Sequence, residues 1–225
     1  VFVGHNAGKS VTSGSFNVAI GWQALDASTV GNSNIAIGYA ALTSLDTSGG
    51  DDGDGNVAIG QEAGTSATTM DGAVLIGNAA GAAITTGDYN NFIGSNAGLS
   101  TTTGHSNTAF GYDALRTNID GDGSVAIGYS ALSQLEPADG LSNNVAVGYQ
   151  AGQVVSTATH NTLIGSQAGT ATTTGGNNTA LGSAALSANN VGINNVAIGK
   201  DALKDNVDGS KSVAVGTSSL ENQEP

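Results

Sequence analysis

A short apolar run that ends in glycine recurs along this chain and constrains its fold more than any other feature. Its clearest copy is residues 17–25, NVAIGWQAL, and the glycine that ends the run occurs thirteen times. The spacing from Gly4 to Gly21 is the same in ten of the twelve steps, and only the steps from Gly38 to Gly60 and from Gly128 to Gly148 are longer. A fixed period of this length is typical of a solenoid, in which each repeat forms one coil and stacks on its neighbours. The glycines, numbered below as position zero of each repeat, are Gly4, Gly21, Gly38, Gly60, Gly77, Gly94, Gly111, Gly128, Gly148, Gly165, Gly182, Gly199 and Gly216.

The three residues before each glycine predict a β-strand that is apolar on both faces. Position −1 is always large and apolar, and position −3 is Val or Ile in nine repeats. β-Branched residues at alternate positions are typical of a short strand, and position −2, usually Ala, lies on the opposite face. One face can line the coil, but the other needs a cover, and the sequence contains no helical segment to supply it. We therefore expect identical chains to cover each other in an oligomer.

Two positions of the repeat vary together in size. Position +4 is either Leu or Gly in every repeat, and the large residues at −2 occur only where +4 is Gly. This correlation predicts that the two side chains share one volume, as close packing requires. Both positions are small in only two repeats, at Ala58/Gly64 and Ala146/Gly152. We expect Leu45, and Leu135 or Leu141, to fill the space left there.

Glycine and asparagine mark the turns. The glycine at zero predicts a tight corner or a positive φ, and a second glycine at −7 predicts the other turn. Asparagine fills position −4 in nine repeats, and stacked coils would align these side chains into an amide ladder. The nine are Asn17, Asn34, Asn56, Asn90, Asn107, Asn144, Asn161, Asn178 and Asn195.

The composition fits a narrow solenoid and excludes several classes of protein. The chain has 225 residues, with Gly 35, Cys 0, 4% aromatic residues and a net charge of −13. Residues 1–220 are predicted to form a single all-β parallel solenoid of about thirteen coils, and 221–225 a tail or linker. Without cysteine there is no disulfide scaffold or thiolate metal site. The acidity argues against nucleic acid as a partner, and the sequence has no apolar run of roughly 18 residues that would predict a membrane span. Val1 lies within a repeat, so we expect a piece of a longer or processed chain.

The repeats resemble those of a known family. NVAIGWQAL, NIAIGYAAL, SVAIGYSAL and NVAVGYQAG are similar to the head repeats of trimeric autotransporter adhesins, the YadA-like head, which also occur in phage tail fibres. The resemblance implies a left-handed parallel β-roll with three chains around one axis. It also implies an extracellular, non-enzymatic role in a bacterial surface adhesin or a virion fibre, with a cell-surface receptor or glycan as partner.

Two other functions are considered from the sequence. The Ile-Gly-x-x-Ala unit is similar to the hexapeptide of left-handed β-helix acyltransferases, but those need it about three times per coil and here it occurs once. His5, His105 and His160 stand at different repeat positions with no recurrent Ser or carboxylate partner, which argues against an enzyme. An ice-binding solenoid is the second alternative, because Thr68, Thr85 and Thr102 form one column and Thr69, Thr86 and Thr103 another.

Candidate binding residues lie in the longer connections and beside the corner. The connections 43–55 and 133–143 are longer than the others, and the first carries the acidic residues Asp46, Asp51, Asp52 and Asp54. Several carboxylates suit Ca²⁺, although EF-hand spacing is absent, and a solvated acidic loop is the alternative. Position +1 collects aromatic residues that would stack in columns, either as a glycan-binding surface or to protect the structure: Trp22, Tyr39, Tyr112, Tyr129 and Tyr149.

Overall fold

The computed structural model describes residues 1–45, 53–136 and 140–221, and these form short parallel strands joined by turns. Contacts divide the chain into two units, Val1–Phe110 (unit 1) and Gly111–Pro225 (unit 2), and each is a parallel β-solenoid. The strands of unit 1 are β1 (Phe2–Val3), β2 (Val18–Ile20), β3 (Ile35–Ile37), β4 (Val57–Ile59), β5 (Val74–Ile76), β6 (Asn91–Ile93) and β7 (Thr108–Phe110). Those of unit 2 are β8 (Val125–Ile127), β9 (Val145–Val147), β10 (Thr162–Ile164), β11 (Thr179–Leu181), β12 (Val196–Ile198) and β13 (Val213–Val215). The all-β solenoid is therefore confirmed for each unit, and the single solenoid over 1–220 stays a prediction.

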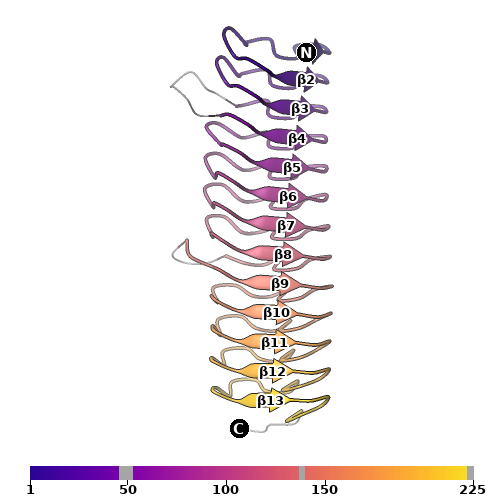
Figure 1. Cartoon of the computed structure of the whole chain (residues 1–225), viewed down its shortest axis with the longest axis vertical. Helices are drawn as coiled ribbons and strands as arrows, with labels where there is room; N and C mark the ends of the chain where they lie inside the picture. The colour runs from indigo at the N-terminus through magenta and orange to yellow at the C-terminus, as the bar shows by residue number, and fades with distance from the viewer. Residues whose placement is uncertain (46–52, 137–139, 222–225) are drawn as a thin grey trace. The chain divides into compact units, whose positions relative to one another are not determined.

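Within each unit, every strand pairs with the next one along the chain at the same repeat position (Figure 1). Ala19 lies opposite Ala36, the equivalent residue of the next repeat. The register persists across the two longer steps, where Ile35 pairs with Val57 and Val125 with Val145. The extra residues of both connections are thus accommodated outside the strands. Glu221 belongs to the last coil, because its carbonyl accepts the Asp205 N–H.

The strands place position −2 inside the coil and positions −3 and −1 outside. From β2 onward position −2 is buried in the coil, as at Ala36 and Ala126, whereas positions −3 and −1 point outward. The exposed fraction of Ile59 is 36% and that of Leu181 is 46%. The prediction that one face of each strand lines the coil is confirmed. The other face is apolar and lacks a cover from this chain within the described part of each unit.

The size correlation between −2 and +4 reflects one shared volume. A Cβ added to Gly8 would lie 2.6 Å from the Phe2 ring, and one added to Gly169 would lie 2.6 Å from Leu163 Cδ2. The large residue at −2 therefore occupies the space that Leu takes at +4 in other repeats. This prediction is confirmed.

The two repeats that are small at both positions are filled from neighbouring coils. The atoms closest to a Cβ on Gly64 belong to Leu75, at 2.7 Å, and Leu42, at 2.9 Å. Gly152 is surrounded in the same way by Leu163, Leu132 and Val155. Leu45 and Leu135 are fully buried as expected, but they are not the nearest residues to these glycines. The alternative filler Leu141 is wrong, because 60% of it is exposed.

The two glycine columns are required for different reasons. Gly148, at position zero, has φ of 140°, and a Cβ there would lie 2.5 Å from the carbonyl oxygen of Gly165 in the next coil. The predicted positive φ is confirmed, and close contact between coils adds a second reason. Gly31, at position −7, does not have a positive φ. A Cβ on it would lie 2.9 Å from Gly53 O, so close approach of the next coil requires glycine there.

The asparagines at position −4 form a hydrogen-bonded ladder through the buried turn of the coils that contain them. Asn161 Oδ1 accepts the backbone N–H of Asn178 at 2.9 Å, and Asn161 Nδ2 donates to Gly175 O at 3.0 Å. Asn178 repeats the pattern with Asn195 N and Gly192 O, at 2.9 Å each. Each amide thus satisfies backbone groups of the following coil that burial would otherwise leave unpaired. The predicted ladder is confirmed.

Candidate functional site

The acidic connection lies only partly within the described residues. Asp46, Asp51 and Asp52 lie outside them. The Asp54 carboxylate accepts the Asn32 N–H at 2.6 Å, and its own N–H donates to Asp71 Oδ1 at 2.7 Å. No group of three or more histidine and acidic side chains in the described ranges could hold a metal ion. Asp54 therefore has a structural partner, and the calcium prediction remains untested at the other three residues.

Asp54 belongs to a column of acceptors at position −6 that the sequence reasoning missed. Along unit 1, the side chain of each coil accepts the N–H of the preceding one. Asn32 accepts from Ser15 and Asp71 accepts from Asp54, and the column continues through Asp88 to His105. The signal was present in the sequence as a short acceptor side chain at the same position of consecutive repeats. These acidic side chains bond one coil to the next, so they are less available to coordinate a metal ion.

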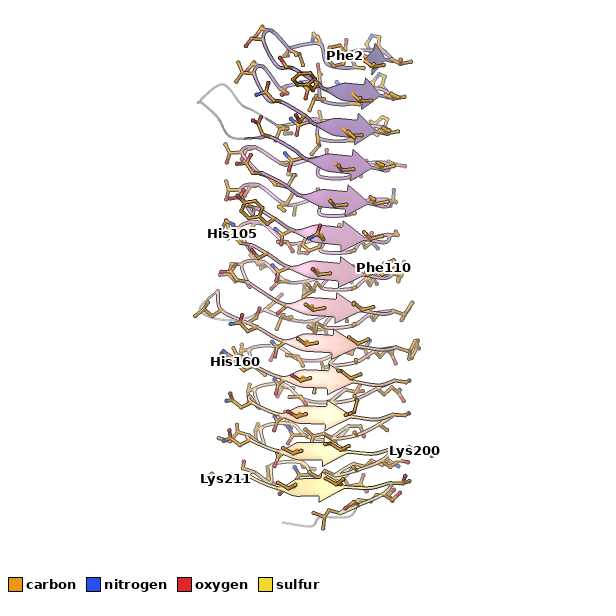
Figure 2. The ribbon with its side chains drawn as sticks, viewed as in Figure 1. Phe2, His105, Phe110, His160, Lys200 and Lys211 are labelled. Atoms are coloured by element: carbon orange, nitrogen blue, oxygen red, sulfur yellow. The ribbon has the colours of Figure 1, made fainter. Side chains whose placement is uncertain are left out.

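The histidines have three unrelated structural roles, as their different repeat positions predict. His105 Nδ1 accepts the Asp88 N–H at 3.0 Å, and Figure 2 places His105 and Phe110 at opposite edges of unit 1. His5 stacks on Trp22 with ring centroids 6.5 Å apart. His160 is in a turn, where its backbone N–H donates to Ser142 O.

The aromatic residues at position +1 form the expected stacks, one in each unit. Trp22 and Tyr39 have centroids 4.9 Å apart and planes 6° from parallel. Tyr112, Tyr129 and Tyr149 form a row with centroids 5.4 Å apart at each step. The stacking predicted from the sequence is confirmed.

This stacking limits how these rings could bind a glycan. Sugars and other apolar ligands pack on ring faces, and both faces of Tyr129 are covered by its neighbours. About half of Tyr129 and of Tyr149 is exposed. Only the outward faces at the ends of each stack, such as the second face of Tyr149, remain for a ligand. The ligand surface predicted at Trp22, Tyr39, Tyr112, Tyr129 and Tyr149 therefore stays a prediction.

In the column formed by Thr68, Thr85 and Thr102, side-chain hydroxyls also form hydrogen bonds between coils. Thr68 Oγ1 donates to Thr85 O at 3.1 Å, and Thr85 Oγ1 donates to Thr102 O at 3.0 Å. Each hydroxyl proton points along the stack to the next coil. Because these donors are used, the column presents mainly acceptors to solvent, which does not favour an ice-binding array.

A further candidate surface is the outward side of the strands in each unit, formed by positions −3 and −1 and called here the outer face. In unit 1 it includes Ile20, Ile59 and Phe110, which are 36–56% exposed. In unit 2 it includes Ile127 and Leu181. Position −1 is apolar at every coil and forms a continuous apolar row within each unit, whereas position −3 is mostly Val or Ile but polar at Asn91, Thr108, Thr162 and Thr179.

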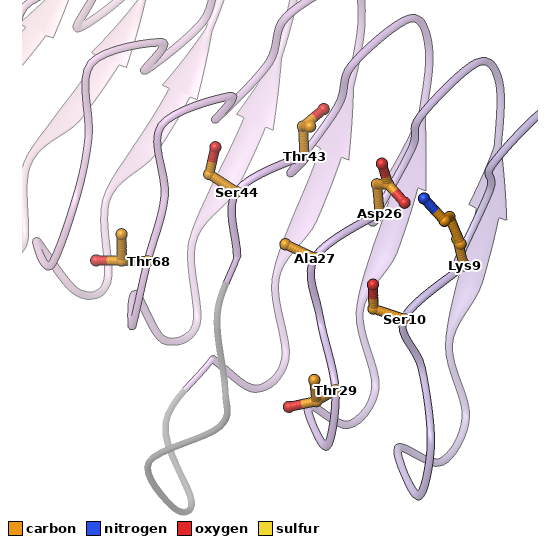
Figure 3. A pocket seen from close by; sticks show the side chains of 8 residues that line it. All are labelled: Lys9, Ser10, Asp26, Ala27, Thr29, Thr43, Ser44 and Thr68. Carbon is orange, nitrogen blue, oxygen red and sulfur yellow. The ribbon is translucent and has the colours of Figure 1, made fainter.

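A polar groove of about 640 Å³ lies on unit 1 (Figure 3). It is formed at positions +5, +6 and +8 of successive coils, and the Lys9 and Asp26 side chains lie next to each other on adjacent coils. The Asp26 Oδ1 atom is buried and has no hydrogen-bond partner. Its lining residues are Lys9, Ser10, Asp26, Ala27, Thr29, Thr43, Ser44 and Thr68.

Within the described part of the chain, there is no helix with the length and apolar character needed to cross a membrane. No protein-family model, curated protein or solved structure matches the chain.

Proposed function

We propose that this chain is a non-enzymatic structural and adhesive segment of a homotrimeric extracellular fibre, with left-handed coils. The observation that carries the proposal is the outer face, on which position −1 is a large apolar residue at each coil. Contiguous apolar patches of this kind are rare on monomers and mark sites of association. The resemblance of the repeats to the heads of trimeric adhesins and to phage tail fibres supplies the number of chains and the location.

The regular spacing supports association between identical chains. A parallel solenoid presents the same residue type at each step of about 4.8 Å. A second copy has the same spacing, so its outer face can match the first over the length of a unit. Closed symmetry then limits the assembly, because each chain uses the same surface. Burial in such an assembly accounts for the exposed apolar side chains, which would otherwise lower the solubility of the chain.

The arrangement of polar residues supports a non-enzymatic role. The rings of His5 and His105 and the carboxylates of Asp54, Asp71 and Asp88 are engaged in stacking or in bonds between coils. A general base or nucleophile requires a partner within hydrogen-bonding distance at an accessible site. The described residues offer no such pair beside the groove. The bacterial surface and the virion remain equal alternatives for the location.

The proposal is tested by placing a charge on the outer face. Ile59→Lys buries an ammonium group in the proposed interface, where an unpaired charge is strongly unfavourable. We expect this variant to dissociate into folded monomers in native mass spectrometry at a concentration where the natural chain is trimeric. The matched control is Thr86→Lys, an exposed position on the connection side, which should remain trimeric. A trimer that persists in Ile59→Lys would contradict the proposed interface.

A further inference from the structure

From the groove on unit 1, we infer that the chain carries a saccharide-binding site centred on Lys9 and Asp26. The inference gives a ligand class to the adhesive role and rests on that proposal for its biological meaning. The groove volume of about 640 Å³ falls in the range of about 300–1,000 Å³ that is typical of small-molecule sites. Its residues come from positions +5, +6 and +8, and none belongs to the outer face.

The first argument is that the fold does not require these polar residues. Position +5 is Lys9 and Asp26 in the first two coils of unit 1, but Ala82 and Leu99 in later coils of the same unit. The backbone bonds at this site do not depend on the side chain, since Ser10 N donates to Asp26 O much as Ala83 N donates to Leu99 O. Stability therefore gives no reason for the charges.

The second argument is the state of the Asp26 carboxylate. Its Oδ1 atom is buried without a hydrogen-bond partner, which is unfavourable for a charged group. Lys9 faces it (Figure 3) but forms no ion pair with any described residue. The related cation Lys204, at position +5 of unit 2, is paired with Asp201 and Glu221. An acceptor and a donor thus lie side by side on adjacent coils at one end of the groove.

The third argument is the character of the hydroxyl groups around this pair. Thr43 Oγ1 donates to Gln23 O at 3.0 Å, and Thr68 Oγ1 donates to Thr85 O at 3.1 Å. Their protons are thus committed, and their oxygens can only accept from a ligand. The Ser10 and Ser44 hydroxyls have no hydrogen bonds within the described chain and can donate or accept. This set complements a ligand whose own hydroxyls both donate and accept.

A neutral saccharide fits this chemistry better than a cation or an ice surface. A sugar hydroxyl can donate to the second carboxylate oxygen of Asp26, since Oδ1 is buried, while a ring or hydroxyl oxygen accepts from Lys9. A Ca²⁺ ion needs about six or more oxygen ligands and would be repelled by the adjacent ammonium group. Ice requires a regular array of one residue type, whereas this groove is lined by Lys, Asp, Ser, Thr and Ala side chains. A zwitterion such as an amino acid is the nearest competitor, and the experiment below separates it.

The experiment is saturation-transfer NMR on the intact chain with three methyl glycosides, those of glucose, galactose and mannose, and with glycine in a parallel sample. We expect transfer to at least one glycoside. Asp26→Ala and Asp26→Thr should lower its affinity by about tenfold or more, the loss expected for one charged hydrogen bond. Ala82 and Thr65 occupy the same position in other coils, so both variants should fold. Thr65→Ala, which lies outside the groove, is the matched control and should bind normally.

Three results would overturn the inference: no transfer to any glycoside, equal transfer to the Asp26 variants, or transfer to glycine alone. The mass of the assembly is a separate readout. A trimer without saccharide binding contradicts the site and leaves the fibre proposal intact. Saccharide binding by a monomer contradicts the fibre proposal and leaves the site intact.

Discussion

The two faces of each strand follow opposite rules. In β8, Ala126 is fully buried, whereas the larger Ile127 is 36% exposed. Globular proteins place large apolar side chains inside, but the interior of one coil is too narrow for a large residue at both −2 and +4. Close packing therefore determines which residue sizes the inner face accepts. The outer face keeps apolar residues that contribute to stability only when another chain covers them.

The largest expected difference in stability is between two glycines, one packed against the next coil and one with open space beside it. Gly77→Ala would place a Cβ against the Gly94 carbonyl, at a φ of 139° that only glycine adopts readily. We expect a loss of about 4–5 kcal/mol or more in the free energy of unfolding, because neither backbone can move. Gly55→Ala is the control, since a Cβ there meets nothing within 4 Å. Its left-handed φ should cost only about 1–2 kcal/mol. Equal losses in urea denaturation would show that contact between coils is not the constraint.

The second-largest effect on stability is expected where positions −2 and +4 share one volume inside the coil. Leu186→Gly should cost about 2–4 kcal/mol, a cavity penalty reduced slightly because Leu186 has a left-handed φ of 55° that glycine adopts without strain. Adding Ala180→Leu should recover part of this loss, since Leu163 and Gly169 already form the reversed pair in the adjacent coil. A double variant no more stable than Leu186→Gly in thermal denaturation would mean that the two positions do not share one space.

Adjacent asparagines allow a comparison of the two faces with one residue type. Asn90 is buried and bonded to Gly87 O, Gly104 O and Asn107 N, whereas Asn91 is exposed on the outer face of β6. Asn90→Ala should cost about 2–3 kcal/mol, because it leaves buried backbone groups unpaired. Asn91→Ala should change the free energy of unfolding by about 0.5 kcal/mol or less. Calorimetry on both variants decides whether the ladder stabilises the coils, and it does not if the two losses agree.

The aromatic stack should give the smallest effect. Tyr129 contacts two rings and Tyr149 contacts one within the stack of unit 2. At about 0.5–1.5 kcal/mol for each aromatic pair, Tyr129→Ala should cost about 1–2 kcal/mol and Tyr149→Ala roughly half of that. Guanidinium denaturation can resolve the two losses. A larger loss for Tyr149→Ala would indicate that its second face is packed against another chain or ligand.

The sequence predicts the features that repeat in residue type. The alternation of β-branched residues, the glycine at zero, the Asn column and the pairing of Phe92 with Gly98 each place one chemical requirement at one position. The strands and their register follow directly, because stacking one coil on the next aligns equal positions.

Features that tolerate many residue types could not be predicted. The left-handed φ at +2 is adopted by Gln23, Ala40 and Glu62 alike, so stacking imposes it and local propensity does not. The groove was missed for a related reason. Lys9 and Asp26 belong to different repeats and are unremarkable alone, and only the register of neighbouring coils brings them together.

The central claim is that the outer face is covered by sister chains. Sedimentation equilibrium of the natural chain at micromolar concentration tests this most directly. The account predicts a single species with three times the 21.8 kDa mass of one chain, and no folded monomer. A folded, soluble species of 21.8 kDa that persists as the concentration is raised would contradict it.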